Sequence, residues 1–297
     1  MQVDYVGGSG ALTSEVIASL RNRSYSPAVT TALRPSVRSV GDLLREWRQH
    51  RRYSQLALAY DAEISPKHLS FVESGRSQPS RDMVLRLAER LEVPLRERNK
   101  LLLAAGFAPV FKERTLEHPD LANVRRAIDL VLAGHQPYPA LAIDRHWTLV
   151  AANNAVAPLL AGAAPALLQP PVNVLRLSLH PEGLAPRIAN LAQWRSHLFA
   201  RLRQQIDFSA DPALMDLLEE LRKYPALSSG GEGNPSDDAA THMVVPLRLV
   251  TERGTLAFIS TTMIFGTPVD VTSSELAIES FFPADAATAE ALQAMGG

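Results

Sequence analysis

The sequence predicts two domains of different class, an all-α domain of five helices followed by an α+β domain. Its 297 residues exceed the roughly 150 residues that one domain usually takes. Five helical patterns of apolar residues follow one another closely between Val40 and Gly106. Beyond Pro119, short segments of alternating apolar and polar residues, typical of strands, appear among further helical ones. We assign residues 1–35 to a flexible leader, 36–112 to the first domain and 119–297 to the second.

Apolar spacing and capping residues define the outer helices of the first domain. The segment Val40–Arg51 carries its large apolar residues, Leu44 and Trp47 among them, on one side. Another helix follows Ser80, since serine is a favourable N-cap. The last helix opens with Pro94 and closes at Gly106, the usual asymmetry of helix ends. These helices can enclose a small apolar core.

Two short helices lie between the outer ones and form a helix-turn-helix. The first, Gln55–Ala62, is expected to turn Leu56 and Ala59 inward. The second, Ser65–Ser74, starts with an N-cap serine followed by proline and stops at Gly75. At about 100° per residue its outer side is polar apart from one aromatic ring, that of Phe71. An aromatic side chain on an otherwise polar, outward-facing side of a helix calls for an explanation.

A polar helix of this kind fits the major groove of DNA, where a phenylalanine can pack on a thymine methyl group. Lys67 can donate to guanine acceptors, and Ser70 can pair with either kind of base edge. We predict base contacts from Lys67, His68, Ser70 and Phe71. The alternative is that Phe71 packs on a neighbouring helix or a partner chain and that His68 is merely solvated.

Phosphate contacts are expected from residues that flank the second helix, namely Arg51, Arg52, Gln55 and Arg76. The charge distribution favours the same domain, because residues 34–118 hold 16 Lys and Arg against 11 Asp and Glu. Residues 119–297 hold 12 against 18. Only the first domain is therefore expected to meet a polyanion, although a difference of this size also arises by chance.

The stretch "SQLALAYDAEISPKHLSFVESGR" resembles the XRE-type, lambda-repressor-like helix-turn-helix domain, and more narrowly the MmyB-like branch of transcription regulators. The resemblance spans about Gly41 to Phe111 and implies binding to a double-stranded DNA operator. One departure is Glu63, where the turn usually carries glycine; a left-handed turn there costs about 1 kcal/mol. Because one such domain touches few base pairs, we expect a homodimer on a palindromic operator.

The second domain begins with two short strands in residues 139–153, joined by a turn at Asp144 to His146. Helical segments broken by prolines continue to about Tyr224, and "LSSGGEGNPSDD" has the composition of an exposed loop. Apolar and polar residues then alternate on both sides of "ERG", which predicts an antiparallel hairpin. The tail "SSELAIESFFPADAATAEALQAM" is expected to return to helix.

This second domain resembles the PAS-like ligand-binding domain of the same MmyB-like group, over roughly residues 119–292. The resemblance implies a small apolar ligand, with a fatty acid as the leading candidate. An apolar tunnel with a few polar groups would suit it, and the candidate residues are Trp147, Asn153, Asn154, Arg176, His180 and Trp194. Structural alternatives are open for each, because asparagine caps helices, arginine pairs with carboxylates and tryptophan fills cores. A rival interpretation makes the domain a protein-docking or dimerisation module without a small ligand.

Catalysis and membrane insertion find little support in the sequence. The chain has no cysteine, which excludes thiolate chemistry and fits a reducing compartment. Metal-binding His-Glu-x-x-His spacing and Gly-x-Ser-x-Gly elbows do not occur in it. The apolar run from Ala157 to Leu168 is shorter than a membrane span, and the N-terminus lacks signal-peptide character. We expect a cytoplasmic protein that is not an enzyme and has no cofactor, with a fatty acid as the candidate ligand.

Overall fold

The computed structural model describes residues 38–225, 245–265 and 270–296, which form two compact units. The helical unit comprises residues 38–115 together with residues 270–274, and the sheet unit comprises residues 116–225, 245–265 and 275–296. Both the predicted leader and the predicted loop "LSSGGEGNPSDD" lie outside the described residues. Each unit is described below by itself.

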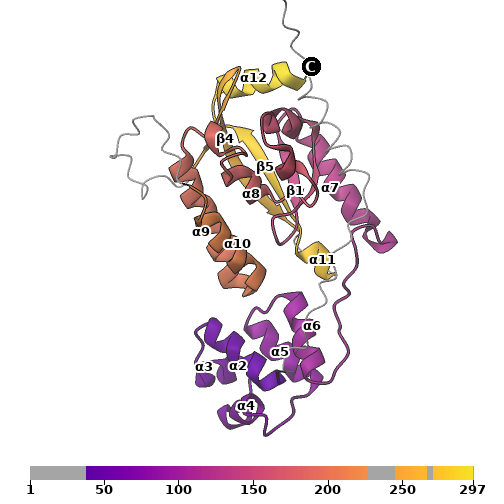
Figure 1. Cartoon of the computed structure of the whole chain (residues 1–297). Coiled ribbons are helices and arrows are strands. Elements are labelled where there is room, and N and C mark those ends of the chain that lie inside the picture. Colours follow the sequence, from indigo (N-terminus) through magenta and orange to yellow (C-terminus); the bar gives the residue numbers. More distant parts are fainter. Residues whose placement is uncertain (1–37, 226–244, 266–269, 297) are drawn as a thin grey trace, which may run out of the picture. The chain divides into compact units, whose positions relative to one another are not determined.

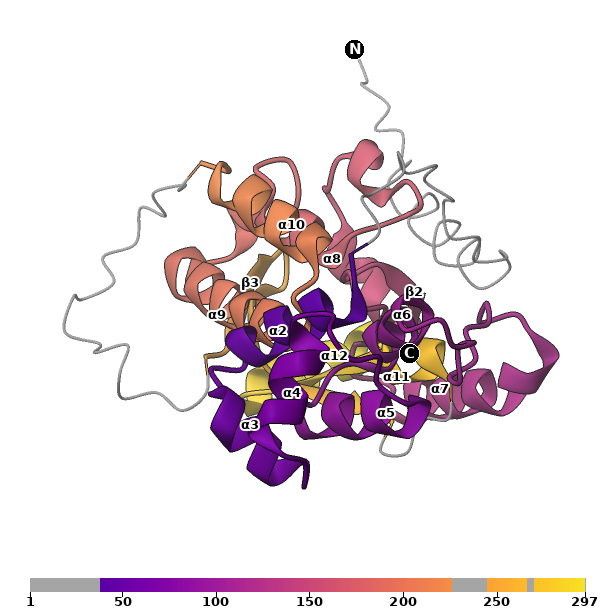
Figure 2. The ribbon, with the colours of Figure 1, turned by 90° about the horizontal axis from the view of Figure 1, so that it is seen from below.

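Five helices make up most of the helical unit, and this confirms the prediction for the first domain. In chain order they are α2 (Val40–His50), α3 (Gln55–Asp61), α4 (Pro66–Glu73), α5 (Arg81–Arg90) and α6 (Leu95–Ala104) (Figures 1 and 2). A serine hydroxyl accepts from a backbone N–H at the N-terminus of each of the first four. Pro94 stands one residue before α6 rather than inside its first turn.

Buried leucines form the core of the helical unit, and one predicted core residue is not among them. Leu58 and Ala59 of α3 are fully buried, whereas 68% of Leu56 is exposed. The prediction that Leu56 turns inward was therefore wrong. Residues 56 and 58 are about 200° apart around a helix, so a helix this short cannot bury both.

Gly41 allows α2 to approach the C-terminal end of α4 closely. A Cβ atom at this position would lie 2.3 Å from the carbonyl oxygen of Val72 and 2.9 Å from that of Glu73. The contact is therefore one of backbone against backbone. It fixes where α4 ends relative to α2.

The sheet unit contains a five-stranded antiparallel sheet with the strand order β2-β1-β5-β4-β3. The strands are β1 (Ala140–Ile143), β2 (Leu149–Ala152), β3 (Leu247–Thr251), β4 (Gly254–Ile264) and β5 (Ala277–Pro283). Both predicted hairpins are present, as β1–β2 and β3–β4. The sheet confirms the predicted α+β class.

The central strand β5 corrects the prediction for the tail, of which only α12 (Ala286–Gly296) is a full-length helix. Strand β5 pairs with β1 on one side and β4 on the other, so its backbone groups have strand partners on both edges. Glu279 is 3% exposed and interrupts the apolar pattern of this strand, which concealed it in the sequence.

Helices cover both faces of the sheet (Figure 1). On one face, apolar residues of α9 (Leu191–Ser209) and α10 (Pro212–Arg222) share a core with Leu249, Leu256 and Phe258. On the other, α7 (Ala122–Gly134) packs against Ala140, Ala142 and Ile278. The remaining short elements are α8 (Val174–Leu179) and the 3₁₀ turns Pro119–Leu121, Asn154–Leu160, Pro165–Leu168 and Ala185–Arg187.

Candidate functional site

Helix α4 is bounded by the signals that the sequence predicted. The Ser65 hydroxyl accepts from the backbone N–H of His68 at 3.1 Å, and Pro66 occupies the first turn. Gly75 has a φ of +72°, and the N–H of Arg76 then bonds to the Phe71 carbonyl oxygen at 2.8 Å. In the turn before the helix, Glu63 has a φ of +54°. The left-handed conformation expected there is thus adopted without glycine.

A buried carboxylate holds α4 against α2 and α3. Glu73 is 1% exposed and accepts from Arg48 Nε at 2.6 Å, Arg48 Nη2 at 2.9 Å and Gln55 Nε2 at 2.8 Å. Burial alone would raise the pKa of Glu73, but the bonds from Arg48 and Gln55 outweigh it and lower the pKa. The amide of Gln55 therefore positions α4, and its predicted phosphate contact stays a prediction.

The outer side of α4 gathers most of the predicted base-contacting residues. Lys67 is exposed, whereas Ser70 and Phe71 are half-buried. The Lys67 ammonium lies 5.7 Å from the centre of the Phe71 ring, and the Arg76 guanidinium lies 5.9 Å from it. Each of these two cations is attracted to the electron-rich face of the aromatic ring. His68 turns toward α5, with its Nε2 3.2 Å from the Met83 sulfur.

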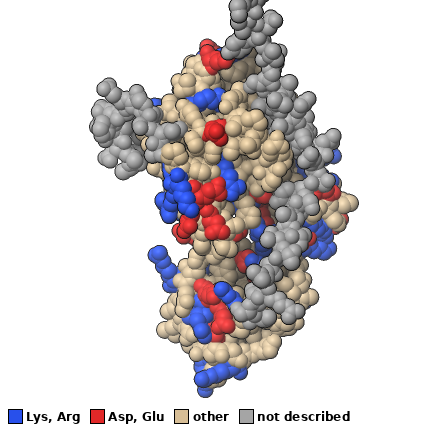
Figure 3. Space-filling view, viewed as in Figure 1, with Lys and Arg blue, Asp and Glu red and all other residues tan. Residues whose placement is uncertain are grey.

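Of the three arginines predicted to contact phosphate, two are exposed and one bonds to the end of α5. Arg76 is exposed next to Phe71, and Arg52 is exposed at a φ of +59°. Arg51 instead donates to the carbonyl oxygens of Leu91 and Glu92 at the end of α5, and burial lowers its pKa. The structure therefore brings Arg76 together with the outer side of α4 and directs Arg51 elsewhere. In Figure 3, basic atoms appear over α4 at the lower end of the view.

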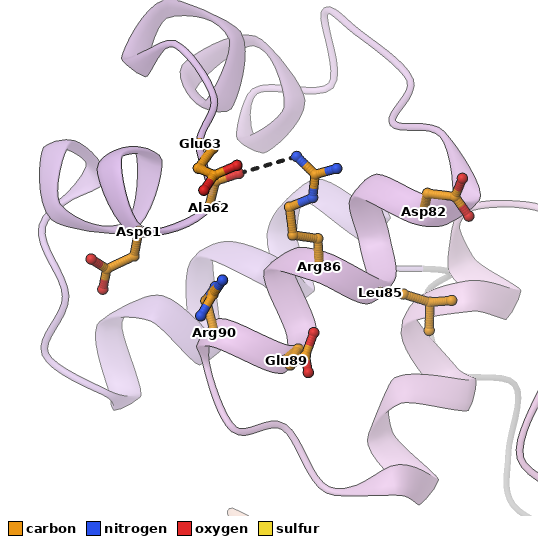
Figure 4. Close-up of a pocket in the computed structure, with 8 residues that line it drawn as sticks. All are labelled: Asp61, Ala62, Glu63, Asp82, Leu85, Arg86, Glu89 and Arg90. Atoms are coloured by element: carbon orange, nitrogen blue, oxygen red, sulfur yellow. Dashed lines mark hydrogen bonds between the residues drawn. The ribbon is translucent and has the colours of Figure 1, made fainter.

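A hollow of about 380 Å³ opens on the side of the turn that faces α5 (Figure 4). Arg86 reaches across it, and its Nη1 lies 3.5 Å from the Ala62 carbonyl oxygen. The lining carries four carboxylates against two guanidinium groups, from Asp61, Glu63, Asp82, Glu89, Arg86 and Arg90. Such a surface repels phosphate, so DNA contacts are expected on the outer side of α4, which carries Lys67, rather than at this hollow.

In the sheet unit, the two tryptophans predicted to line a ligand site are both buried: Trp147 contacts α9, and Trp194 belongs to α9 and reaches α8. Trp147 donates from Nε1 to Gln205 Oε1 at 2.7 Å and has a φ of +64°, unusual for so bulky a residue. Trp194 donates to the Ser178 hydroxyl at 3.1 Å and stacks on His197. Burial, followed by the charge of Arg201, lowers the pKa of His197.

Within the described residues, Asn153, Arg176 and His180, three of the predicted polar ligand contacts, have protein partners, and Asn154 is exposed. The side-chain oxygen of Asn153 accepts from the Ala140 N–H, and its amide donates to the Leu132 and Tyr138 carbonyl oxygens. It therefore ties β1 to α7. Arg176 donates to both carboxylate oxygens of Glu220, at 2.8 and 2.7 Å. His180 lies edge-on to Tyr224, and its Nδ1 accepts from the Glu182 N–H.

A polar cluster that the sequence did not single out lies between α9 and β5. Arg201 donates to both oxygens of the buried Glu279, at 2.6 and 3.1 Å, and to the Thr262 hydroxyl at 2.8 Å. Its guanidinium lies 4.9 Å from the Trp147 ring centre. Thr262, Glu279 and Trp147 each lie more than 50 positions from Arg201 in sequence, so no local pattern could reveal the cluster.

Among the described residues, no group of His, Asp and Glu is arranged to hold a metal ion. In the same part of the chain, no helix is both long and apolar enough to cross a membrane.

Comparison with known proteins adds two family matches. The MmyB-like transcription regulator ligand-binding domain matches residues 124–295, and a helix-turn-helix domain matches residues 39–101. A search of curated proteins found no match. Both matched domains belong to transcription regulators and neither is catalytic, which confirms the prediction of a non-enzymatic protein. The ligand-binding match alone covers more than half of the chain, and the chain therefore belongs to the family of MmyB-like transcription regulators, with a DNA-binding helix-turn-helix domain and a ligand-binding domain.

Proposed function

We propose that this regulator reads its operator with α4 and that a small apolar acid, a fatty acid in the first instance, controls the reading. The observation that carries the DNA-reading part is the Phe71 ring with the Lys67 and Arg76 cations 5.7 and 5.9 Å from its centre. A phenylalanine flanked by two cations offers an apolar surface to a thymine methyl and charges to the groove around it. Arg76 and Arg52, which are exposed, supply phosphate contacts.

For the ligand, Arg201 is the group best suited to meet a carboxylate. It already binds the carboxylate of Glu279 in two-point fashion, next to the apolar residues that α9 and the sheet share. Trp147 and Trp194 lie in that same core and supply walls for an aliphatic chain. In the proposal the ligand carboxylate competes with Glu279 for Arg201, and the Thr262 hydroxyl still donates to Glu279. Asn153, Arg176 and His180 keep their structural partners.

A homodimer in the cytoplasm completes the proposal. A single α4 reaches few base pairs, and two copies would read half-sites with centres about 34 Å apart. The rival function is a sheet unit that docks a protein and holds no small molecule. It is favoured by apolar side chains on the sheet unit that are more than two-fifths exposed, Leu130, Met263, Ile264 and Phe282 among them.

Chemical extraction separates the two functions. The full chain, purified from a heterologous host, is extracted with organic solvent, and bound small molecules are identified by mass spectrometry. About one fatty acid per chain supports the ligand function, and Arg201→Met should abolish retention while Arg195→Met, on the same helix, should not. Extracts that contain no stoichiometric compound, with no thermal shift from added decanoate or hexadecanoate, favour the docking function.

A further inference from the structure

The connection between β4 and β5 is longer than the sheet requires. These strands are antiparallel neighbours, and Ile264 at the end of β4 pairs with Ala277 at the start of β5. Two residues suffice to join such a pair, whereas here residues 265–276 do so. Of the described residues in this connection, 270–274 belong to the helical unit rather than to the sheet unit. We call residues 270–274 the inserted segment; it contains the short helix α11 (Val271–Ser274).

Buried polar contacts fasten the inserted segment to the chain that follows α6. The Asp270 side chain is completely buried, and its Oδ2 accepts from Arg114 Nη1 at 2.9 Å. The Val271 N–H donates to the Lys112 carbonyl oxygen at 2.9 Å, and the Thr272 hydroxyl donates to the Arg114 carbonyl oxygen at 2.5 Å. Val271 is also fully buried, and α11 contacts α6 (Figure 1). The segment is thus an integral part of the helical unit.

Immediately after the segment, the chain enters the core of the sheet unit. Glu275 accepts from Arg145 Nη1 at 3.3 Å, and Leu276 is buried among residues of α7 and β1. Three residues further on, Glu279 is held by Arg201 and Thr262. Only Glu275 separates Ser274 of the helical unit from Leu276, and the extended chain between them spans at most about 7 Å.

The chain between Ser274 and Leu276 is too short to absorb a large movement of β5. A shift of β5 by more than a few ångströms must either displace the inserted segment or pull it away from Arg114. Separating Asp270 from Arg114 is costly, because one or both charges would stay buried without a partner. A displacement of β5 relative to the helical unit would therefore pull on Arg114 in the chain that follows α6.

We propose that the inserted segment is the coupling element of the regulator. A change in the Arg201–Glu279 pairing moves β5, and the Asp270–Arg114 ion pair passes that movement to the DNA-reading helices. The proposal rests on the proposed function in that ligand binding is the natural cause of such a change. It supplies the two-state mechanical link that ligand control requires, since a ligand acts only through a difference between conformations.

A double-mutant cycle on the full chain tests the coupling without any ligand. Operator DNA is first selected from a random library with the wild-type protein, and its Kd is then measured for Glu279→Gln, Asp270→Asn and the double variant. Glu279→Gln should change Kd by about five-fold or more, the lower range of allosteric couplings. In the Asp270→Asn background the same substitution should change Kd by less than about two-fold. The matched control is Glu220→Gln, which removes the carboxylate that Arg176 binds on α10 and should leave Kd unchanged in both backgrounds.

Equal effects of Glu279→Gln in the two backgrounds would overturn the proposal, as would the absence of an effect in either. Should Asp270→Asn fail to fold, Thr272→Val is the milder way to weaken the segment, because it removes one hydrogen bond at nearly constant volume. Hydrogen exchange in α6 gives a second readout and should accelerate in Glu279→Gln only while Asp270 is intact. The cycle uses no ligand, so its outcome is independent of whether extraction finds a fatty acid.

Discussion

Replacing Glu73 by glutamine tests the ion-pair network that holds α4 against α2 and α3. The substitution keeps the shape of the side chain and removes its charge. Arg48, which is 9% exposed, then loses the carboxylate that it contacts through Nε and Nη2. The new amide also presents an NH₂ group to donors that previously met an oxygen.

The expected loss of stability follows from burial. Removing one partner of a buried ion pair costs about 3–5 kcal/mol, because the other charge stays buried and uncompensated. Residues 38–115 should form a unit of roughly 4–12 kcal/mol in total stability. The variant should therefore lose a large share of the folding free energy of the helical unit and, with it, operator binding.

Hydrogen exchange measured by mass spectrometry reads the helical unit separately from the sheet unit. Peptides of α2 and α4 should exchange between about one hundred and several thousand times faster in Glu73→Gln. Glu46→Gln is the matched control, because Glu46 pairs with Arg38 at 2.7 Å while both side chains are more than half exposed. Its loss should lie within about 1 kcal/mol. If the two variants exchange alike, the network does not hold α4 and the reasoning fails.

The pH dependence of hydrogen exchange in the same peptides tests whether the charged form of Glu73 stabilises the helical unit. The folded-state pKa of Glu73 is lowered, so its stabilisation is complete above the unfolded value near 4.5 and is lost as pH falls through the folded value. Wild-type exchange in α4 should accelerate in that range. The profile of Glu73→Gln should be flatter there.

Two further substitutions probe backbone packing and the sheet unit. Gly41→Ala would place a Cβ 2.3 Å from the Val72 carbonyl oxygen, so it should destabilise the helical unit despite the higher helix propensity of alanine; unchanged thermal unfolding would refute the close approach. Asp211 has a pKa of about 2, chiefly because His146 hydrogen-bonds its carboxylate, so it stabilises the sheet unit above pH 3.8 and loses that effect as pH falls toward 2. Asp211→Asn should retain the N-cap of α10 yet lose about 2 kcal/mol at neutral pH, as measured by urea unfolding, and an unchanged midpoint would count against this role.

Local signals in the sequence were sufficient to predict the helices of the helical unit. Serine caps and the Gly75 stop set the limits of α4 to within a residue, and the polar outer side singled out Phe71. The orientation of Leu56 was mistaken because an apolar residue on a two-turn helix was assumed to be buried. For the contacts of Arg51, the deciding partners lie about 40 residues away at the end of α5.

The sheet unit was less predictable because its defining contacts are non-local. Strand β5 lies between β1 and β4, which come from opposite ends of the domain, and its buried Glu279 is tolerated only because Arg201 and Thr262 meet it. Arg176 was a candidate ligand contact for which pairing with a carboxylate stayed open, and its partner, Glu220, lies 44 positions away. The inserted segment could not be foreseen, since Asp270 and Arg114 are 156 positions apart.

The central claim is that the outer side of α4 reads DNA bases, and binding-site selection with two variants tests it most directly. Lys67→Ala should relax preference at one base position per half-site and weaken the operator by about 1–3 kcal/mol. Arg76→Ala should weaken all sequences alike and reduce the salt slope of binding by about one unit. If both variants select the wild-type operator with wild-type affinity and salt dependence, α4 is not the helix that reads the DNA.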